Sequence, residues 1–128
     1  SLTSEYLLDT NILIYYTKGY HDIKSFIDNL ALRHALKISI LTKIEFLGWD
    51  KHTPEGFEKC KGLIETATIY SVDENIANKA IELKRDTKIR LADAVIAATA
   101  ILNKLKLVTR NTEDFKNVDE LEVINIFK

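Results

Sequence analysis

The chain has 128 residues, of which 46% are hydrophobic and 29% charged, and its net charge is −1 at pH 7. These values are typical of a soluble globular protein and exclude a disordered, fibrous or strongly basic class. The longest stretch without a charged residue, 94–103, is about half the length that a membrane-spanning helix requires. The first residues lack the positive region of a secretory signal, and the lone Cys60 fits a reducing compartment. We therefore expect a single cytoplasmic domain over residues 1–128.

Short β-rich runs alternate with helical patterns along the chain. In chain order, the predicted elements are a strand at 6–8, a helix at 23–30, a strand at 37–41, a helix at 57–67, a strand at 68–72, helices at 76–83 and 91–102, and strands at 105–109 and 123–127. Thr53, before Pro54, and Asp73 are typical residues to cap helices. Helices between strands favour right-handed crossovers, and so an α/β fold with a mainly parallel sheet of about five strands covered on both faces.

In such a sheet, ligands bind beyond the carboxyl ends of the strands. Asp9 follows the first predicted strand and precedes Thr10 and Asn11, so its carboxylate is expected at this edge, where it would either cap the next helix or act in a site. Glu45 follows the second strand. Because Thr42 and Glu45 fit a capping box, capping is the favoured interpretation of Glu45 taken alone.

Asp93 lies in the first turn of the apolar segment 91–102, which predicts a buried helix. A buried carboxylate needs a partner, here the helix N-terminus, a cation or the nearby Arg90. Asn111 and Asp114 follow another predicted strand and also supply oxygen atoms, although such residues are common in loops.

Parallel topology would bring these carboxylates to one edge, where their mutual repulsion calls for a cation. Oxygen ligands favour Mg²⁺ or Mn²⁺, whereas the histidines and the single cysteine show no zinc spacing. Water activated by such a metal can hydrolyse a phosphodiester. The segment 84–110 holds seven Lys or Arg against two acids and could bind a nucleic-acid backbone. Most of these basic residues are expected to form a solvated face, with Arg90 and Arg110, which flank acidic candidates, as the exceptions.

Four segments together resemble the PIN domains, and among them the small ribonuclease toxins of VapBC toxin–antitoxin pairs. These segments are LLDTNILI (7–14), LTKIEF (41–46), LADAVIAATA (91–100) and LVTRNTEDF (107–115). The resemblance implies a three-layer α/β/α sandwich and a Mg²⁺- or Mn²⁺-dependent endoribonuclease that leaves a 5′-phosphate and a 3′-hydroxyl. It also implies a homodimer that a cognate antitoxin holds inactive.

By position, the resemblance assigns the metal-binding acids to Asp9, Glu45 and Asp93. Thr10 and Asn11 would arrange the first of them. Many members of the family have a fourth acid two residues after the residue that corresponds to Thr109, where this chain has Asn111, and the next carboxylate is Asp114. An amide contributes no charge, so the sequence leaves open whether the site holds one metal ion or two.

Two alternatives remain at this stage. The substitution at Asn111 is compatible with a catalytically silent PIN-like module that binds RNA or protein. A phosphatase with Asp9 as the nucleophile is the other alternative, but Asn11 stands where such enzymes have a second Asp.

Overall fold

A computed structural model describes residues 4–127 of the chain. In chain order, the elements are β1 (Tyr6–Leu8), α1 (Thr10–Thr17), α2 (His21–Leu32), β2 (Lys37–Ser39), α3 (Ile40–Leu47), α4 (Pro54–Glu65), β3 (Thr68–Tyr70), α5 (Glu74–Asp86), α6 (Leu91–Leu102), β4 (Lys106–Val108), the 3-10 helix η1 (Thr112–Phe115) and β5 (Val123–Ile124).

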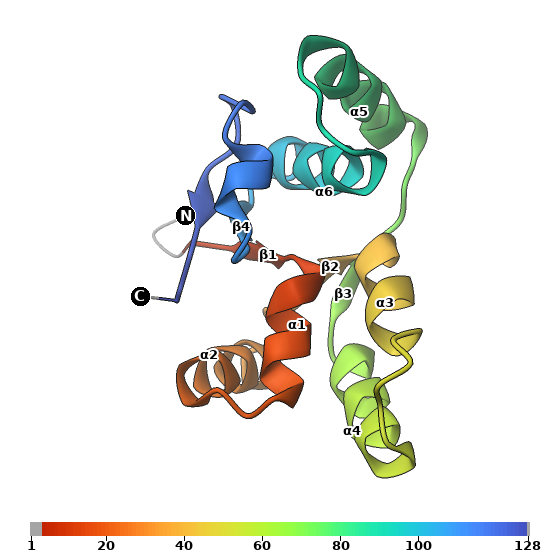
Figure 1. The fold of residues 1–128 in the computed structure, drawn as a ribbon, viewed down its shortest axis with the longest axis vertical. Helices are drawn as coiled ribbons and strands as arrows, with labels where there is room; N and C mark the ends of the chain where they lie inside the picture. Colours follow the sequence, from red (N-terminus) through yellow and green to blue (C-terminus); the bar gives the residue numbers. More distant parts are fainter. Residues whose placement is uncertain (1–3, 128) are drawn as a thin grey trace.

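The short strands lie at the centre of the molecule (Figure 1). Their hydrogen bonds form two groups, β1-β4-β5 and β2-β3, which meet where β1 lies beside β2. Every pair is parallel, with Leu7 opposite Leu107 and Ile38 opposite Ile69. The predicted α/β fold with a mainly parallel arrangement of strands is therefore confirmed.

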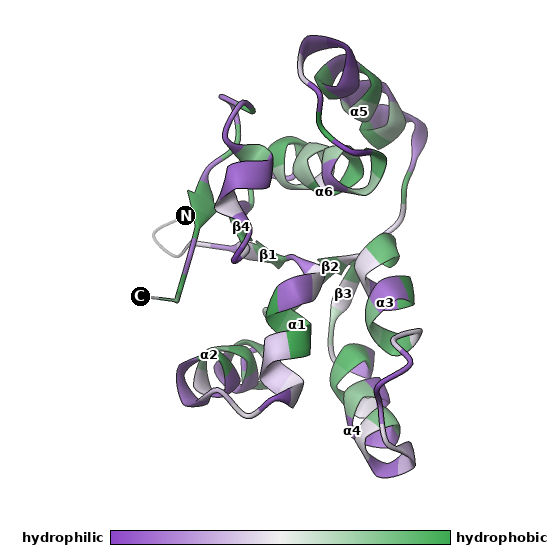
Figure 2. Ribbon diagram, in the orientation of Figure 1, coloured by the Kyte–Doolittle hydropathy of each residue, from purple (hydrophilic) through white to green (hydrophobic). Residues whose placement is uncertain are grey.

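Successive side chains of each strand point to opposite faces of the sheet, and this divides the core into two halves. Leu7 and Leu107 face α5 and α6, whereas Leu8 and Val108 face α1, α2, α3 and α4. The result is the three-layer arrangement in Figure 1. Figure 2 shows α6 almost wholly in the green of apolar residues, as a helix enclosed between the sheet and α5 requires. Within residues 4–127, no helix is long and apolar enough to cross a membrane.

Local signals predicted several element boundaries correctly. The side chain of Thr53 accepts a hydrogen bond from the Gly56 N–H at 2.9 Å, and that of Asp73 accepts one from the Ile76 N–H at 2.8 Å. Four of the five strands are shorter than expected. The second, for example, ends at Ser39, whose hydroxyl caps α3 by accepting from the Leu41 N–H at 3.1 Å.

The capping-box interpretation of Glu45 is wrong. Because α3 starts at Ile40 with Ser39 as its N-cap, Thr42 lies inside the helix and is fully buried. Glu45 is therefore the sixth of the eight residues of α3, too far along the helix to satisfy its first backbone N–H groups.

Candidate active site

Asp9 is a buried carboxylate at the carboxyl end of β1, with 6% of its surface exposed. It is the N-cap of α1 and accepts a hydrogen bond from the Thr10 N–H at 2.8 Å. Its other oxygen accepts from Asn11 Nδ2 at 3.0 Å and from Thr109 Oγ1 at 2.9 Å. These three donors satisfy an ionised carboxylate, so Asp9 caps the helix and also lies at the predicted edge of the sheet.

Thr109 connects the ends of two neighbouring strands. It follows β4, is fully buried, and its hydroxyl also accepts from Asn11 Nδ2 at 3.1 Å and from the Asn111 N–H at 3.1 Å. The Arg110 N–H donates to Asn11 Oδ1 at 3.0 Å. Because β1 and β4 are parallel neighbours, Asp9 and the loop after β4 are held together by this network.

Glu45 reaches the same edge from α3. Thr10 Oγ1 lies 2.7 Å from Glu45 Oε1, to which it donates, and 3.2 Å from Thr42 Oγ1. The start of α1 therefore fixes the Glu45 side chain from outside its own helix. This contact joins residues 35 positions apart and leaves the second Glu45 oxygen available to a further ligand.

Asp93 lies in the first turn of α6 with 13% of its side chain exposed. Arg90 Nε is 3.5 Å from Asp93 Oδ2, and another Arg90 nitrogen is 3.6 Å from Asp114 Oδ2. The Arg90 side chain itself is 78% exposed. Both distances exceed those of a close charge-assisted hydrogen bond, so the expected ion pair exists but holds Asp93 only loosely.

These side chains surround one cleft of about 490 Å³. The predicted residues that line it are Asp9, Thr10, Asn11, Glu45, Arg90, Asp93, Asn111 and Asp114. The sequence analysis missed four further lining residues, Ile14, Trp49, Ala92 and Ile96.

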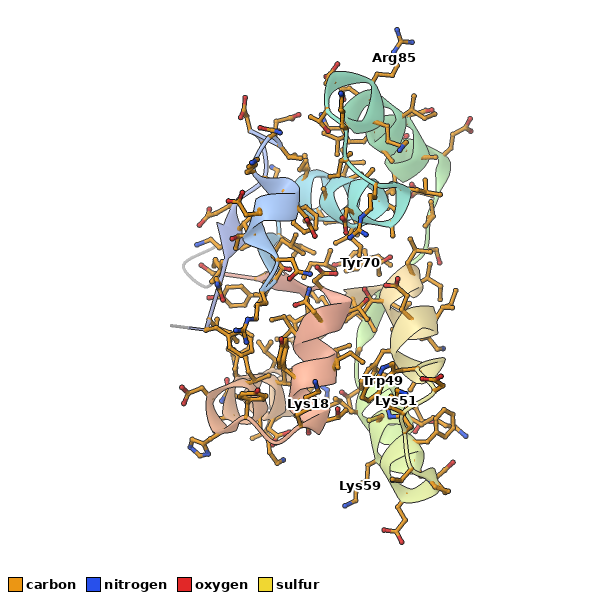
Figure 3. All side chains as sticks on the ribbon, viewed as in Figure 1. Lys18, Trp49, Lys51, Lys59, Tyr70 and Arg85 are labelled. Carbon is orange, nitrogen blue, oxygen red and sulfur yellow. The ribbon has the colours of Figure 1, made fainter. Side chains whose placement is uncertain are left out.

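Two predicted residues and most of the basic segment lie away from the cleft. Thr109 lies beneath it and acts through Asp9. The Arg110 guanidinium stacks on Phe127 at 4.2 Å and on Tyr15 at 5.0 Å, and does not line the cleft. Arg85 projects from the far end of α5 (Figure 3). Of the seven basic residues between 84 and 110, Arg90 alone lines the cleft.

The cleft carries excess negative charge. Burial raises the pKa of Asp9, and the negative charges of Asp93 and Glu45 raise it further, against the hydrogen bonds from Thr109 and Thr10. Burial likewise raises the pKa of Asp93, opposed by Arg90 and reinforced by Asp114 and Glu45. Carboxylates that mutually disfavour ionisation fit a divalent cation, which would remove the repulsion.

Asp9, Glu45 and Asp93 are the residues that could hold such an ion, with Asn111 and Asp114 beside them. Their chemistry fits Mg²⁺ or Mn²⁺, because all of these side chains offer oxygen. Within residues 4–127, no three His, Cys, Asp or Glu side chains are already close enough to enclose a metal. Binding would therefore draw the carboxylates together.

The model of one family, described as "PIN domain", matches residues 6–121. The chain belongs to the PIN-domain family. This PIN domain is similar to a chain of a toxin–antitoxin complex from Klebsiella pneumoniae, with 32% identity, a TM-score of 0.77, and coverage of 94% of this chain and 96% of the other. A VapBC2 complex from Rickettsia felis bound to promoter DNA is 24% identical, with a TM-score of 0.78 and coverage of 94% and 97%.

A third similar structure, DNA-bound VapBC from Salmonella typhimurium, has 21% identity and a TM-score of 0.79, and the match covers 96% of this PIN domain and 98% of that chain. No curated protein sequence matches the chain. These three structures are toxin–antitoxin complexes, two of them VapBC complexes, which confirms the resemblance in the sequence.

Proposed function

We propose that this PIN domain is a Mg²⁺- or Mn²⁺-dependent endoribonuclease, the toxin of a toxin–antitoxin pair. The main observation is that Asp9, Glu45 and Asp93, from three separate parts of the chain, line one cleft. Burial there raises the pKa of Asp9 and of Asp93, and neighbouring carboxylates raise both pKa values further. Membership of a family of nucleases supports the same conclusion.

In this proposal Asp9, Glu45 and Asp93 hold the ion. When bound, the ion activates a water molecule and stabilises the leaving oxygen of a phosphodiester. The hydrogen bonds that Thr109 and Thr10 donate to Asp9 lower the pKa of its carboxyl against the larger effect of burial, and Thr10 also orients Glu45.

The remaining polar residues act on the substrate and on the water. Arg90, largely exposed at the edge of the cleft, binds a nonbridging oxygen of the RNA phosphate and leaves Asp93 and Asp114 to do so. The Asn111 amide orients water but adds no charge, and Asp114 is the nearest carboxylate on that loop. No protein nucleophile is required.

The proposed partners are a cognate antitoxin and a second copy of the chain. The similar structure from Klebsiella pneumoniae is a toxin–antitoxin complex. Ile44 on α3 is 63% exposed and directly precedes Glu45 of the cleft. Leu91, at the start of α6, is 67% exposed and lies two residues before Asp93. Exposed apolar side chains of this size suit an interface between subunits, and we assign them to the homodimer.

The test is cleavage of a pool of structured RNAs by purified protein with Mg²⁺, Mn²⁺ or EDTA. Asp93→Asn is assayed alongside, because it removes a carboxylate of the cleft and exposes any contaminating nuclease. We expect metal-dependent cleavage by the wild type alone, with 5′-phosphate ends. Equal cleavage by the two proteins would refute the role of Asp93. RNA binding without cleavage would favour the silent module that Asn111 leaves open.

A further inference from the structure

A second groove, of about 520 Å³, lies next to the catalytic cleft. Its walls are the end of α1, the start of α2, the loop after α3, and α4. We call it the lysine groove, because four lysines line it against one acid, Glu55; they are Lys18, Lys24, Lys51 and Lys59.

Three of these lysines are available to a ligand. Lys24 is paired with Asp28 at 2.9 Å, whereas no salt bridge within residues 4–127 engages Lys18, Lys51 or Lys59. All three are exposed, and they come from three different segments around the groove (Figure 3). The Lys18 ammonium lies over the Tyr15 ring, 5.4 Å from its centroid, a contact that does not neutralise its charge. Clustered ammonium groups without a carboxylate partner indicate an anionic ligand.

Trp49 joins the lysine groove to the catalytic cleft. This residue lines both, and it is the only tryptophan of the chain. The ring is half-buried and meets the His52 ring edge to face, with centroids 5.1 Å apart. Because one residue borders both spaces, a polymer bound in the cleft can continue past Trp49 into the groove.

His52 gives Trp49 a rigid support. Its Nε2 is 2.7 Å from the Phe46 carbonyl oxygen, to which it donates, and its ring also meets Phe46 and Phe57 edge to face. Phe46 is fully buried in the core. An aromatic side chain held in this way is suited to stack a base, because little conformational entropy remains to be lost on binding.

We propose that the lysine groove binds the single-stranded RNA that extends from the scissile phosphate, with Lys18, Lys51 and Lys59 on backbone phosphates and a base stacked on Trp49. This inference rests on the proposed function, since it names the path of the same substrate. Lysines beside an aromatic ring are the combination that recognises single strands without reading sequence.

The dimensions of α1 suit this path. Asp9 caps its first turn and Lys18 its last, so the two residues are about 13 Å apart along the helix axis. Thr10, Asn11 and Ile14 line the cleft, and the following turn of the same helix lines the groove. A strand of a few nucleotides would therefore contact both.

An acidic peptide is the other anionic polymer that such a surface could take. RNA is favoured because the groove continues a cleft proposed for phosphodiesters, and because a stacking platform serves a base better than a carboxylate.

The test uses Trp49 as the probe. The full-length protein in EDTA, which prevents cleavage, is titrated with a short oligouridylate while tryptophan fluorescence and the anisotropy of labelled RNA are followed. We expect binding and fluorescence quenching to occur together. The affinity should fall with salt, since each phosphate contact in a single strand contributes about 0.7 to the slope of log K against log salt.

The variant Lys18→Ala/Lys51→Ala/Lys59→Ala should lower this slope by about 2 and the affinity in about 0.1 M salt by about 100-fold. With Mg²⁺ it should raise KM for RNA while kcat changes little. The matched control is Lys61→Ala, since Lys61 is exposed on α4 two residues after Lys59 and faces about 200° away. It should behave like the wild type.

The proposal is overturned if the triple variant keeps the wild-type slope, or if RNA binds without quenching. It is also overturned if an oligoglutamate peptide binds in a lysine-dependent way and RNA does not, which would indicate an acidic protein segment as the ligand. If metal-dependent cleavage persists and the lysine substitutions have no effect, the role of the lysine groove is refuted and the proposed nuclease activity is retained. If RNA binding depends on the lysines but no metal-dependent cleavage occurs, the nuclease activity is refuted and the role of the lysine groove is retained.

Discussion

Thr109→Val tests whether the hydroxyl beneath the cleft stabilises the ionised form of Asp9 and so lowers its pKa. Valine has the shape of threonine, so the packing around this fully buried residue is retained and only the hydroxyl is lost. The lost contacts are the bond donated to Asp9 at 2.9 Å and those accepted from Asn11 Nδ2 and the Asn111 N–H, each at 3.1 Å.

A hydrogen bond to a charged group contributes about 1.5–3 kcal/mol, and a neutral one about 1 kcal/mol. Since Asn111 is an exposed residue, water can replace part of the bond to its N–H, and we expect the free energy of unfolding to fall by about 2–3 kcal/mol at neutral pH. In urea this is a shift of the midpoint by about 1 M at an unchanged m-value.

The pH dependence identifies the bond to Asp9 as the source. The pKa of Asp9 is raised overall by burial, and the Thr109 hydroxyl lowers it, so removing the hydroxyl raises the pKa further. At acid pH Asp9 is protonated in both proteins, and the difference in stability falls to the contribution of the lost neutral hydrogen bonds, about 1 kcal/mol. As the pH rises through these pKa values, Thr109→Val should lose stability relative to the wild type.

Thr99→Val is the matched control. Thr99 is equally buried, but its hydroxyl donates only to the Val95 carbonyl one turn earlier in α6, at 2.8 Å. Its loss should lower the free energy of unfolding by about 1 kcal/mol or less, independent of pH. Equal losses in the two variants, or a loss at position 109 that does not change with pH, would refute the role of Thr109.

Three further predictions concern the charge and the assembly of the site. Asp93→Asn removes a buried carboxyl group whose pKa is raised, so in EDTA the variant should be at least as stable to urea as the wild type. Its advantage in stability should grow as the pH rises through that pKa, because the wild-type carboxylate becomes charged there. A variant that is less stable than the wild type at neutral pH would contradict this. Asn111→Asp adds a carboxylate to the cleft and should tighten Mn²⁺ binding measured by calorimetry, and unchanged affinity would place the ion away from that loop. Ile44→Asp should convert the proposed dimer to monomers in sedimentation experiments, whereas an intact dimer would exclude α3 from the interface.

Sequence patterns predicted the parts of the fold that local physics determines. Thr53 and Asp73 cap their helices as expected, because a cap depends on residues within one turn. The parallel topology followed from the alternation of elements, since a crossover of one hand connects parallel strands. That topology is the reason why Asp9 and Asp93 were expected in one cleft.

Interactions between residues far apart in the sequence determined the features that local patterns did not predict. Taken alone, Glu45 was expected in a local capping box, but Ser39 starts the helix earlier and the partner of Glu45 is Thr10, in another element. Arg110 was expected near the acids, but the rings of Tyr15 and Phe127 attract its guanidinium.

The lysine groove had no signal in the sequence. Its three lysines without salt bridges come from separate segments without a shared motif, so their proximity depends on how α1 and α4 pack against α3, which lies between them in the chain of contacts. The single tryptophan was the one available hint, since Trp49 follows the helix that carries Glu45.

Calorimetric titration of the protein with Mn²⁺ is the most direct test that the carboxylates form one metal site. The wild type is compared with Asp93→Asn and with Asp119→Asn, which removes an exposed carboxylate outside the cleft. We expect saturable binding by the wild type and the control, with an affinity at least about tenfold lower in Asp93→Asn, since second-shell changes alone cost about that much. Equal affinity in all three proteins, or no binding by the wild type, would contradict the metal site.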